Sequence, residues 1–263
     1  MSQLLSRVLV TVVALPLVLW IVYLGGWWLF GLGLFAALVA LHELYVMARS
    51  LRPLVLAGYA GATTTLLGAQ LGGSTWMVGG FTLTLLLAFL LYGIAETRQS
   101  GTITMGSTVL GVAWIGLGLG HLLLLRDIPE HGRLAIFAVL LAVFADDTAA
   151  YFIGRLVGRH KLAPALSPGK TWEGFVAGSI VAVAVTFFTL YDQGFLTIPE
   201  SLVLGAVLAL AGAAGDLFES AIKRDLQVKD SGRLLGGHGG MLDRIDAHLF
   251  AAVAAFYVVI ALS

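Results

Sequence analysis

The sequence lacks cysteine and is poor in charge. With no cysteine among its 263 residues, it excludes disulfides and thiolate metal sites, and it leaves oxygen and imidazole ligands for any metal. Charged residues make up 11% of the chain, against about a quarter in a typical soluble domain. Hydrophobic residues make up 59%, and the mean hydropathy is +0.96. So much apolar surface indicates a chain dissolved in lipid.

Long apolar runs dominate the chain. Because a spanning helix needs about 20 apolar residues, the sequence predicts an all-α integral membrane protein, a polytopic bundle of about nine transmembrane helices. The break at Gly72-Gly73, between the third and fourth runs, is the least marked. The first run continues into a second, so we interpret it as a retained span and not as a cleaved signal peptide. The predicted spans are Val8–Leu24, Trp27–Ala48, Leu54–Leu71, Thr75–Tyr92, Thr104–Leu125, Leu134–Val157, Trp172–Leu190, Leu202–Phe218 and Ala247–Leu262.

The basic residues predict the orientation of these spans. Of the 15 Lys and Arg residues, 13 lie in one set of alternate connections, and only Arg126 and Arg133 lie in the other set. Basic residues concentrate on the cytoplasmic side of a membrane protein. The sequence therefore predicts a protein of the cytoplasmic (inner) membrane whose N-terminus is cytoplasmic and whose C-terminus is outside.

Two polar connections on the predicted cytoplasmic side carry the candidate chemistry, Arg155–Thr171 and Glu219–Asp246. Asp216 lies at the end of one apolar span. Asp243 and Asp246 lie three residues apart where the predicted last helix begins. Carboxylates on adjacent turns, joined by a third from a neighbouring span, suit Mg²⁺. The glycines before them leave backbone N–H groups free for phosphate oxygens at a helix N-terminus. A cytoplasm-facing polar cavity is the expected site.

Positive charge accompanies these carboxylates. Lys223, Arg224, Lys229 and Arg244 could neutralise a polyphosphate. The alternative is that they only determine topology or contact anionic lipids, and that the glycines only form turns.

A second group of polar residues precedes this stretch. Asp146 and Asp147 lie inside an apolar span, where carboxylates usually mark a substrate or ion path; bonding to a neighbouring helix is the alternative. Ser167-Pro168, followed by Lys170 to Glu173, is typical of a turn that enters a helix and binds an anion. We expect His42 and Glu43 to snorkel to the cytoplasmic interface, with contact to a substrate as the alternative. We expect His248 to pack between helices, with a role as a ligand as the alternative.

Two blocks of the sequence resemble the phosphatidate cytidylyltransferase (CDP-diacylglycerol synthase) family. The first is the signature formed by Ser220–Arg224, Lys229–Gly232 and His238–Asp246, and it departs from the family at Gly236, where Pro is usual. The second is the central region from Asp146 to Gly174, where Gly169 replaces a residue that is commonly Lys. The resemblance is strong over the C-terminal half. It implies a single polytopic membrane domain, residues 1–263, in which 1–130 supply N-terminal spans and 131–263 form the catalytic half.

The resemblance also implies an activity and its residues. The reaction is CTP plus phosphatidate giving CDP-diacylglycerol plus diphosphate, assisted by Mg²⁺; a second, monovalent cation stays open. A homodimer in contact with membrane lipids is implied, and no nucleic-acid partner. The implied catalytic residues are Asp216, Lys223, Arg224, Asp243 and Asp246, with Asp216, Asp243 and Asp246 as metal ligands. The implied substrate-binding residues are Asp146, Asp147, Ser167, Lys170, Thr171, Glu173, Ser220, Lys229, Asp230, His238, Gly239, Gly240 and Arg244.

Two other functions remain open from the sequence. A CTP-dependent kinase of a lipid alcohol would release CDP in place of diphosphate. A cation-coupled transporter would also use carboxylates within the membrane, although no inverted repeat is visible.

Overall fold

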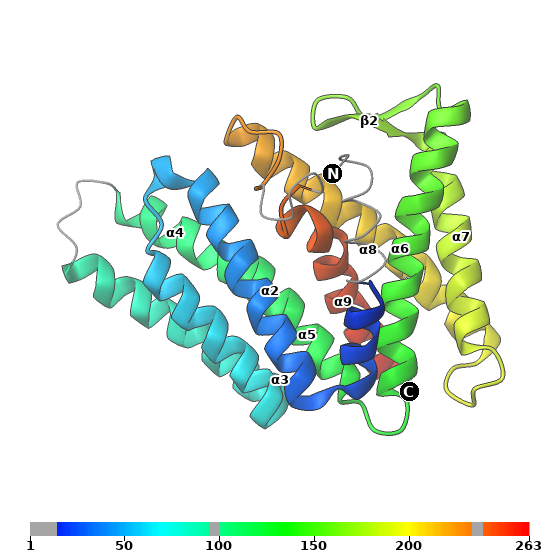
Figure 1. The fold of residues 1–263 in the computed structure, drawn as a ribbon, viewed down its shortest axis with the longest axis horizontal. Helices are drawn as coiled ribbons and strands as arrows, with labels where there is room; N and C mark the ends of the chain where they lie inside the picture. Colours follow the sequence, from blue (N-terminus) through cyan, green and yellow to red (C-terminus); the bar gives the residue numbers. More distant parts are fainter. Residues whose placement is uncertain (1–14, 95–99, 233–238, 263) are drawn as a thin grey trace. The chain divides into compact units, whose positions relative to one another are not determined.

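The computed structural model describes residues 15–94, 100–232 and 239–262 (Figure 1). The chain forms two compact units. Unit 1 contains residues 1–127 and 226–245, and unit 2 contains residues 128–225 and 246–263. Residues 226–245, which carry much of the signature, belong with the N-terminal spans in unit 1.

Unit 1 is built from helices with small residues at their contacts. Its described elements are a short apolar helix, Leu15–Leu24, then α2 (Gly26–Met47), η1 (Arg49–Leu51), α3 (Val55–Ile94), α4 (Gly101–Gly111), η2 (Val112–Gly116) and α5 (Leu117–Arg126). The last three form one helical span over 101–126 in which η2 is a π-helical turn. The predicted span Thr104–Leu125 is therefore confirmed.

Helix α3 folds back on itself in the middle. Its 40 residues contain non-helical backbone at Gly72 and Gly73, and Gly73 has a φ of +67°. The Thr64 hydroxyl donates to the Gly80 carbonyl at 3.1 Å, which joins the two arms across the break. The two arms lie side by side in Figure 1, in cyan. The predicted boundary at Gly72-Gly73 is thus confirmed as a tight turn between two antiparallel helical arms.

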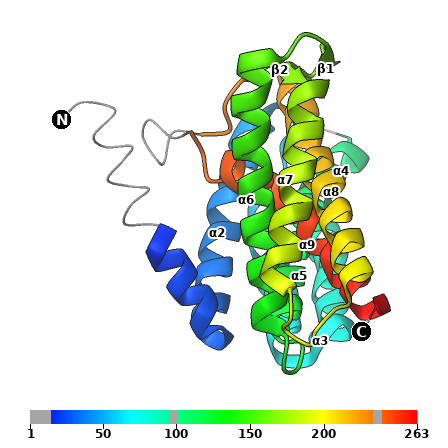
Figure 2. The same cartoon turned by 90° about the vertical axis from the view of Figure 1, so that its right-hand side faces the viewer.

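Unit 2 combines long helices with a small hairpin. Its elements are α6 (Gly132–Val157), β1 (Lys161–Ala163), β2 (Ser167–Thr171), α7 (Trp172–Leu190) and α8 (Ile198–Asp225), and it includes α9 (Leu242–Leu262) from residue 246 onward. Helices α6 and α7 lie alongside each other (Figure 2). Glycines at 154, 174 and 178 let their backbones approach closely, as in many membrane helix pairs.

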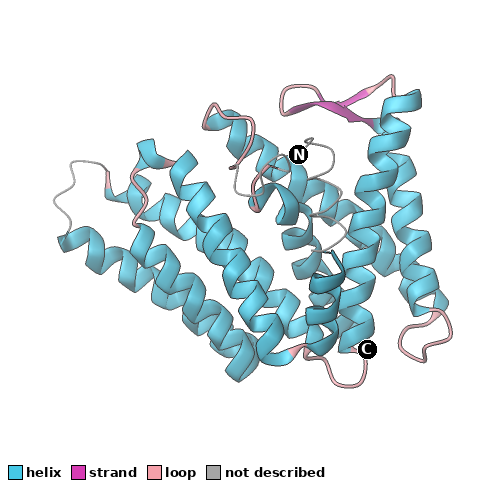
Figure 3. Cartoon of the chain, viewed as in Figure 1, coloured by secondary structure: helices cyan, strands magenta, loops and turns pink. Residues whose placement is uncertain are grey.

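The hairpin corrects one prediction. Strands β1 and β2 pair antiparallel, with Lys161 opposite Thr171 (magenta in Figure 3). Ser167–Thr171 is therefore a strand and not a turn, because its N–H and C=O groups pair across the hairpin. The predicted entry into a helix is confirmed, because α7 begins at Trp172, directly after the strand. The Thr171 hydroxyl accepts the Gly174 N–H at 3.2 Å and caps α7.

The all-α polytopic membrane class is confirmed by the helices. Among the described residues, seven helices are long and apolar enough to span a membrane. One of them is the folded α3, and the first predicted span is described only from residue 15 onward. The predicted total of about nine is therefore not confirmed.

Candidate active site

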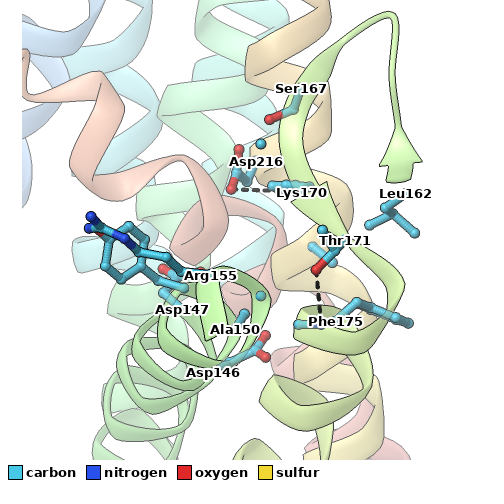
Figure 4. A pocket seen from close by; sticks show the side chains of 15 residues that line it. Asp146, Asp147, Ala150, Arg155, Leu162, Ser167, Lys170, Thr171, Phe175 and Asp216 are labelled. Atoms are coloured by element: carbon cyan, nitrogen blue, oxygen red, sulfur yellow. Dashed lines mark hydrogen bonds and ion pairs between the residues drawn. The ribbon is translucent and has the colours of Figure 1, made fainter. Parts of the chain in front are cut away.

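A cavity of about 570 Å³ lies within unit 2. This volume is in the range of small-molecule sites. The lining combines charged and hydroxyl groups with apolar side chains from α6, the hairpin, α7 and α8 (Figure 4). Its lining residues are Asp146, Asp147, Ala150, Tyr151, Gly154, Arg155, Leu162, Ser167, Gly169, Lys170, Thr171, Gly174, Phe175, Ala213 and Asp216.

Helix α6 supplies one wall of the cavity with two carboxylates. Asp146 is 6% exposed, whereas Asp147 is open toward the cavity. Steps of four along α6 then place Tyr151 and Arg155 on the same face, and Arg155 donates to the Tyr151 hydroxyl at 3.0 Å. The expectation that these carboxylates face a polar cavity is confirmed, and their role toward a substrate stays a prediction.

An ion pair joins the hairpin to α8 at this cavity. The Lys170 ammonium lies 2.6 Å from the Asp216 carboxylate, as the dashed line in Figure 4 shows. The Ser220 hydroxyl, one turn further along α8, is 3.5 Å from the same carboxylate. Lys170 of the first polar connection and Asp216, at the end of an apolar span, are thus in direct contact.

Negative charge exceeds positive charge around the cavity. Three carboxylates line it, together with the two basic groups Arg155 and Lys170. The Asp246 carboxyl of α9 is also buried, with 8% of the residue exposed. Excess buried negative charge is costly unless a cation or protons compensate it.

This donor set fits a hard divalent cation. Carboxylate and hydroxyl oxygens are the ligands that Mg²⁺ prefers. Among the described residues, no three His, Asp or Glu side chains already stand in the arrangement of a metal site. The assignment of Mg²⁺ to Asp216, Asp243 and Asp246 stays a prediction, and of the three only Asp216 lines this cavity.

The loop before α9, which includes Ser231, Gly232 and Gly239–Met241 and is called the signature loop below, is held by two carboxylates of the protein itself. Asp243 accepts the Gly240 N–H at 2.8 Å, and Glu43 of α2 accepts the N–H groups of Met241 at 3.0 Å and Leu242 at 2.9 Å. The expectation that the glycine N–H groups are free is wrong for Gly240, whose N–H donates to Asp243. Snorkelling of Glu43 is also wrong, because this side chain is only 6% exposed.

Several other residues that the sequence predicts for the site bond to groups of the protein itself. Lys223 pairs with Glu219 at 2.6 Å, and the Arg224 side chain donates to the Leu166 carbonyl at 3.1 Å. Glu173 accepts from the His160 ring at 2.6 Å and does not line the cavity. Exposed positions are Lys229, Asp230 and Arg244, while Gly239 is half-buried; His238 lies outside the described residues. Their roles toward substrates stay predictions.

Sequence reasoning missed Tyr151, Arg155 and Glu43 as site residues. The signal for the first two was present, since they continue the face of α6 that begins at Asp147. For Glu43 no local signal exists, because its donors lie far along the chain.

Close packing of α6 against α7 yields a first prediction. A Cβ atom at Gly178 would collide with the Asp146 carboxylate. We expect Gly178→Ala to cost about 1–3 kcal/mol of stability and to lower activity, measured by thermal unfolding in detergent and by turnover. The control is Gly79→Ala, where nothing lies within 4 Å of the added Cβ. A Gly178→Ala protein as stable and active as Gly79→Ala would contradict this packing.

The fold and the cavity define an α-helical polytopic membrane protein with a carboxylate-rich and partly basic site, suited to phosphates and a cation. The model of the cytidylyltransferase family matches residues 5–262. The chain belongs to this family.

Individual proteins that are similar to this chain carry the name phosphatidate cytidylyltransferase. Over 249 residues the chain is 34% identical to the phosphatidate cytidylyltransferase of Staphylococcus haemolyticus, which covers 93% of this chain and 94% of that protein. It is 34% identical over 272 residues to the phosphatidate cytidylyltransferase of Brucella suis, covering 98% and 93%. It is 40% identical over 156 residues to that of Mycobacterium bovis, covering 59% of this chain and 50% of the relative.

Proposed function

We propose that this chain is a phosphatidate cytidylyltransferase, which converts CTP and phosphatidate into CDP-diacylglycerol and diphosphate. The family match over residues 5–262 carries this proposal. The cavity supports it, because charged groups beside apolar side chains such as Leu162 and Phe175 suit a lipid phosphate with its acyl chains. The chain is thus a nucleotidyltransferase that acts on a membrane lipid.

The reaction joins two anions. An oxygen of the phosphatidate phosphate attacks the α-phosphorus of CTP and forms a new P–O bond. The bond from the α-phosphorus to the bridging oxygen of the β-phosphate breaks, and diphosphate leaves with that electron pair. A lipid phosphate is already ionised near neutral pH, so the attack needs no general base. The protein's task is to position two phosphates and to neutralise their charge.

Residues of the cavity are suited to this task. Lys170 and Arg155 bring positive charge to phosphate oxygens, and the Lys170–Asp216 pair holds the ammonium in place before substrate arrives. The Thr171 hydroxyl accepts the Gly174 N–H and caps α7. Its contribution to the cavity is to fix the start of this helix. Because the ammonium is held by protein contacts, little reorganisation is needed when charge develops on the leaving diphosphate.

The proposed metal ligands are Asp216, Asp243 and Asp246. Mg²⁺, when bound, would neutralise phosphate oxygens of CTP and of the departing diphosphate. Asp216 is supported by its place in the lining of the cavity, and Asp246 is a buried carboxyl, 8% exposed. Asp243 lies one turn before Asp246 on α9, and it also holds the signature loop.

We propose that the cavity and the N-terminus face the cytoplasm and that the C-terminus lies outside the cytoplasmic membrane. The clustering of Arg155, Lys161 and Lys170 around one end of unit 2 supports this orientation. A homodimer is proposed from the resemblance, and light scattering of the detergent-solubilised protein measures it.

The decisive experiment is an assay with the purified protein in detergent micelles that contain phosphatidate, with CTP and Mg²⁺. We expect equal amounts of diphosphate and CDP-diacylglycerol, complete loss of activity with excess EDTA, and recovery when Mg²⁺ is restored. Release of CDP without diphosphate would replace this proposal with a lipid-alcohol kinase. Ion flux in proteoliposomes without any nucleotide turnover would replace it with a transporter.

A further inference from the structure

The carboxylate of Glu43 is buried against the signature loop of unit 1. Its Oε1 accepts the Met241 N–H at 3.0 Å. Its Oε2 accepts the Leu242 N–H at 2.9 Å and the Ser231 hydroxyl at 3.2 Å. Both oxygens therefore bond to the loop or to the start of α9, and the side chain is 6% exposed. This carboxylate is an internal acceptor and not an interfacial charge.

The loop backbone is shaped around this carboxylate. A Cβ atom at Gly232 would lie 2.5 Å from Oε1 of Glu43. A Cβ atom at Gly240 would lie 2.5 Å from Oε2 and would also collide with the Ser231 hydroxyl. A side chain at either position would therefore force the Glu43 carboxylate to move away from the loop. Gly232 and Gly240 thus leave room for the Glu43 carboxylate, which is a structural role for these two glycines of the signature.

The same loop is bonded to Asp243. The Ser231 N–H lies 3.2 Å from each carboxylate oxygen of Asp243, while its hydroxyl donates to Glu43. The Gly240 N–H donates to Asp243, and the next two N–H groups donate to Glu43. Two carboxylates from α2 and α9 thus hold one loop, and Glu43 holds the backbone immediately before Asp243.

The start of α9 explains how an anion can be buried here. The first N–H groups of a helix have no partners within the helix, and its dipole favours negative charge at this end. Bonds from donors to a carboxylate are about twice as strong as bonds between neutral groups. Glu43 therefore supplies the cap that α9 does not obtain from its own preceding residue.

We propose that Glu43 is a positioning residue for the nucleotidyl transfer, resting on the function proposed above. It holds Ser231, Met241 and Leu242 at the start of α9, and so orients the Asp243 and Asp246 carboxylates. With both oxygens engaged and the group buried, Glu43 itself touches neither substrate nor metal. The N-terminal spans thereby contribute directly to the arrangement of the signature.

The test combines hydrogen exchange with kinetics on Glu43→Gln. The amide keeps the size of the side chain, but it loses the charge and presents an NH₂ group toward donors. We expect amide exchange in peptides covering residues 239–245 to accelerate at least about tenfold. We expect kcat to fall about 10–100-fold while the KM for CTP changes less than about threefold. Ser231→Ala, which removes one of the three bonds, should show the same changes to a smaller extent.

The matched control is His42→Gln, a change at the residue next to Glu43 on α2. Among the described contacts, the His42 ring bonds only to the Tyr59 hydroxyl. It should keep wild-type exchange and kcat. Unchanged exchange in Glu43→Gln, or faster exchange with full kcat, would overturn the positioning role. If the wild-type protein makes no CDP-diacylglycerol, the proposed function fails, and the exchange data alone then decide whether Glu43 holds the loop.

Discussion

Asp246→Asn is expected to lower the rate of diphosphate release by more than about 100-fold, in the range found when a group that stabilises charge in a transition state is removed. The side chain is 8% exposed, and a buried carboxylate of this kind is costly unless a cation compensates its charge. The amide has the same shape, so folding should be retained. The measurement is turnover across a Mg²⁺ titration, with thermal unfolding in parallel.

The matched control for this change is Asp192→Asn. Asp192 is exposed in the connection between α7 and α8 and has a φ of +57°, which Asn tolerates well. The control should be as active and as stable as the wild type. An Asp246→Asn protein with full turnover at ordinary Mg²⁺ would refute the metal assignment.

Lys170→Gln has the second largest expected effect. This change removes the ammonium that lies 2.6 Å from Asp216, and it leaves the carboxylates of the cavity with less compensating charge. It also removes a cation proposed to bind phosphate oxygens. We expect kcat/KM to fall by about 100-fold or more, and Lys170→Arg to recover part of the loss because it restores the charge. Steady-state kinetics at saturating Mg²⁺ measure both variants.

Lys161→Gln is the control on the same hairpin. Lys161 is exposed on β1 and is not among the residues that line the cavity. Equal losses in the two variants would show that general attraction of anions, and not the pairing at Asp216, explains the effect of Lys170.

The spans of this protein could be predicted from the sequence because their signals are local. Helix α7 occupies Trp172–Leu190, as predicted, since Thr171 caps one end and the apolar run stops at the other. The turn within α3 was visible as a pair of glycines, which adopt a backbone that other residues avoid. Asp146 and Asp147 were found because a carboxylate in an apolar run stands out.

Features that depend on distant partners could not be predicted. The hairpin before α7 has strands of three and five residues without alternation of apolar and polar side chains. The sequence predicts that Glu43 lies at the membrane interface, because nothing near it in the sequence indicates the donors of the signature loop. For the same reason, the sequence predicts that the Gly240 N–H is free to bind phosphate oxygens, whereas it donates to Asp243. Which acceptor occupies a helix N-terminus is a property of the tertiary fold.

The bonds of Glu43 also bear on how the chain is made. Their donors lie 188 to 199 residues further along the chain. During synthesis, α2 enters the membrane long before the ribosome reaches residue 231, and its carboxylate must remain hydrated until then. Contacts between such distant residues close late, after the intervening chain is in place. We therefore expect unit 1, although its helices are synthesised first, to complete its native bonding only when α9 has been inserted.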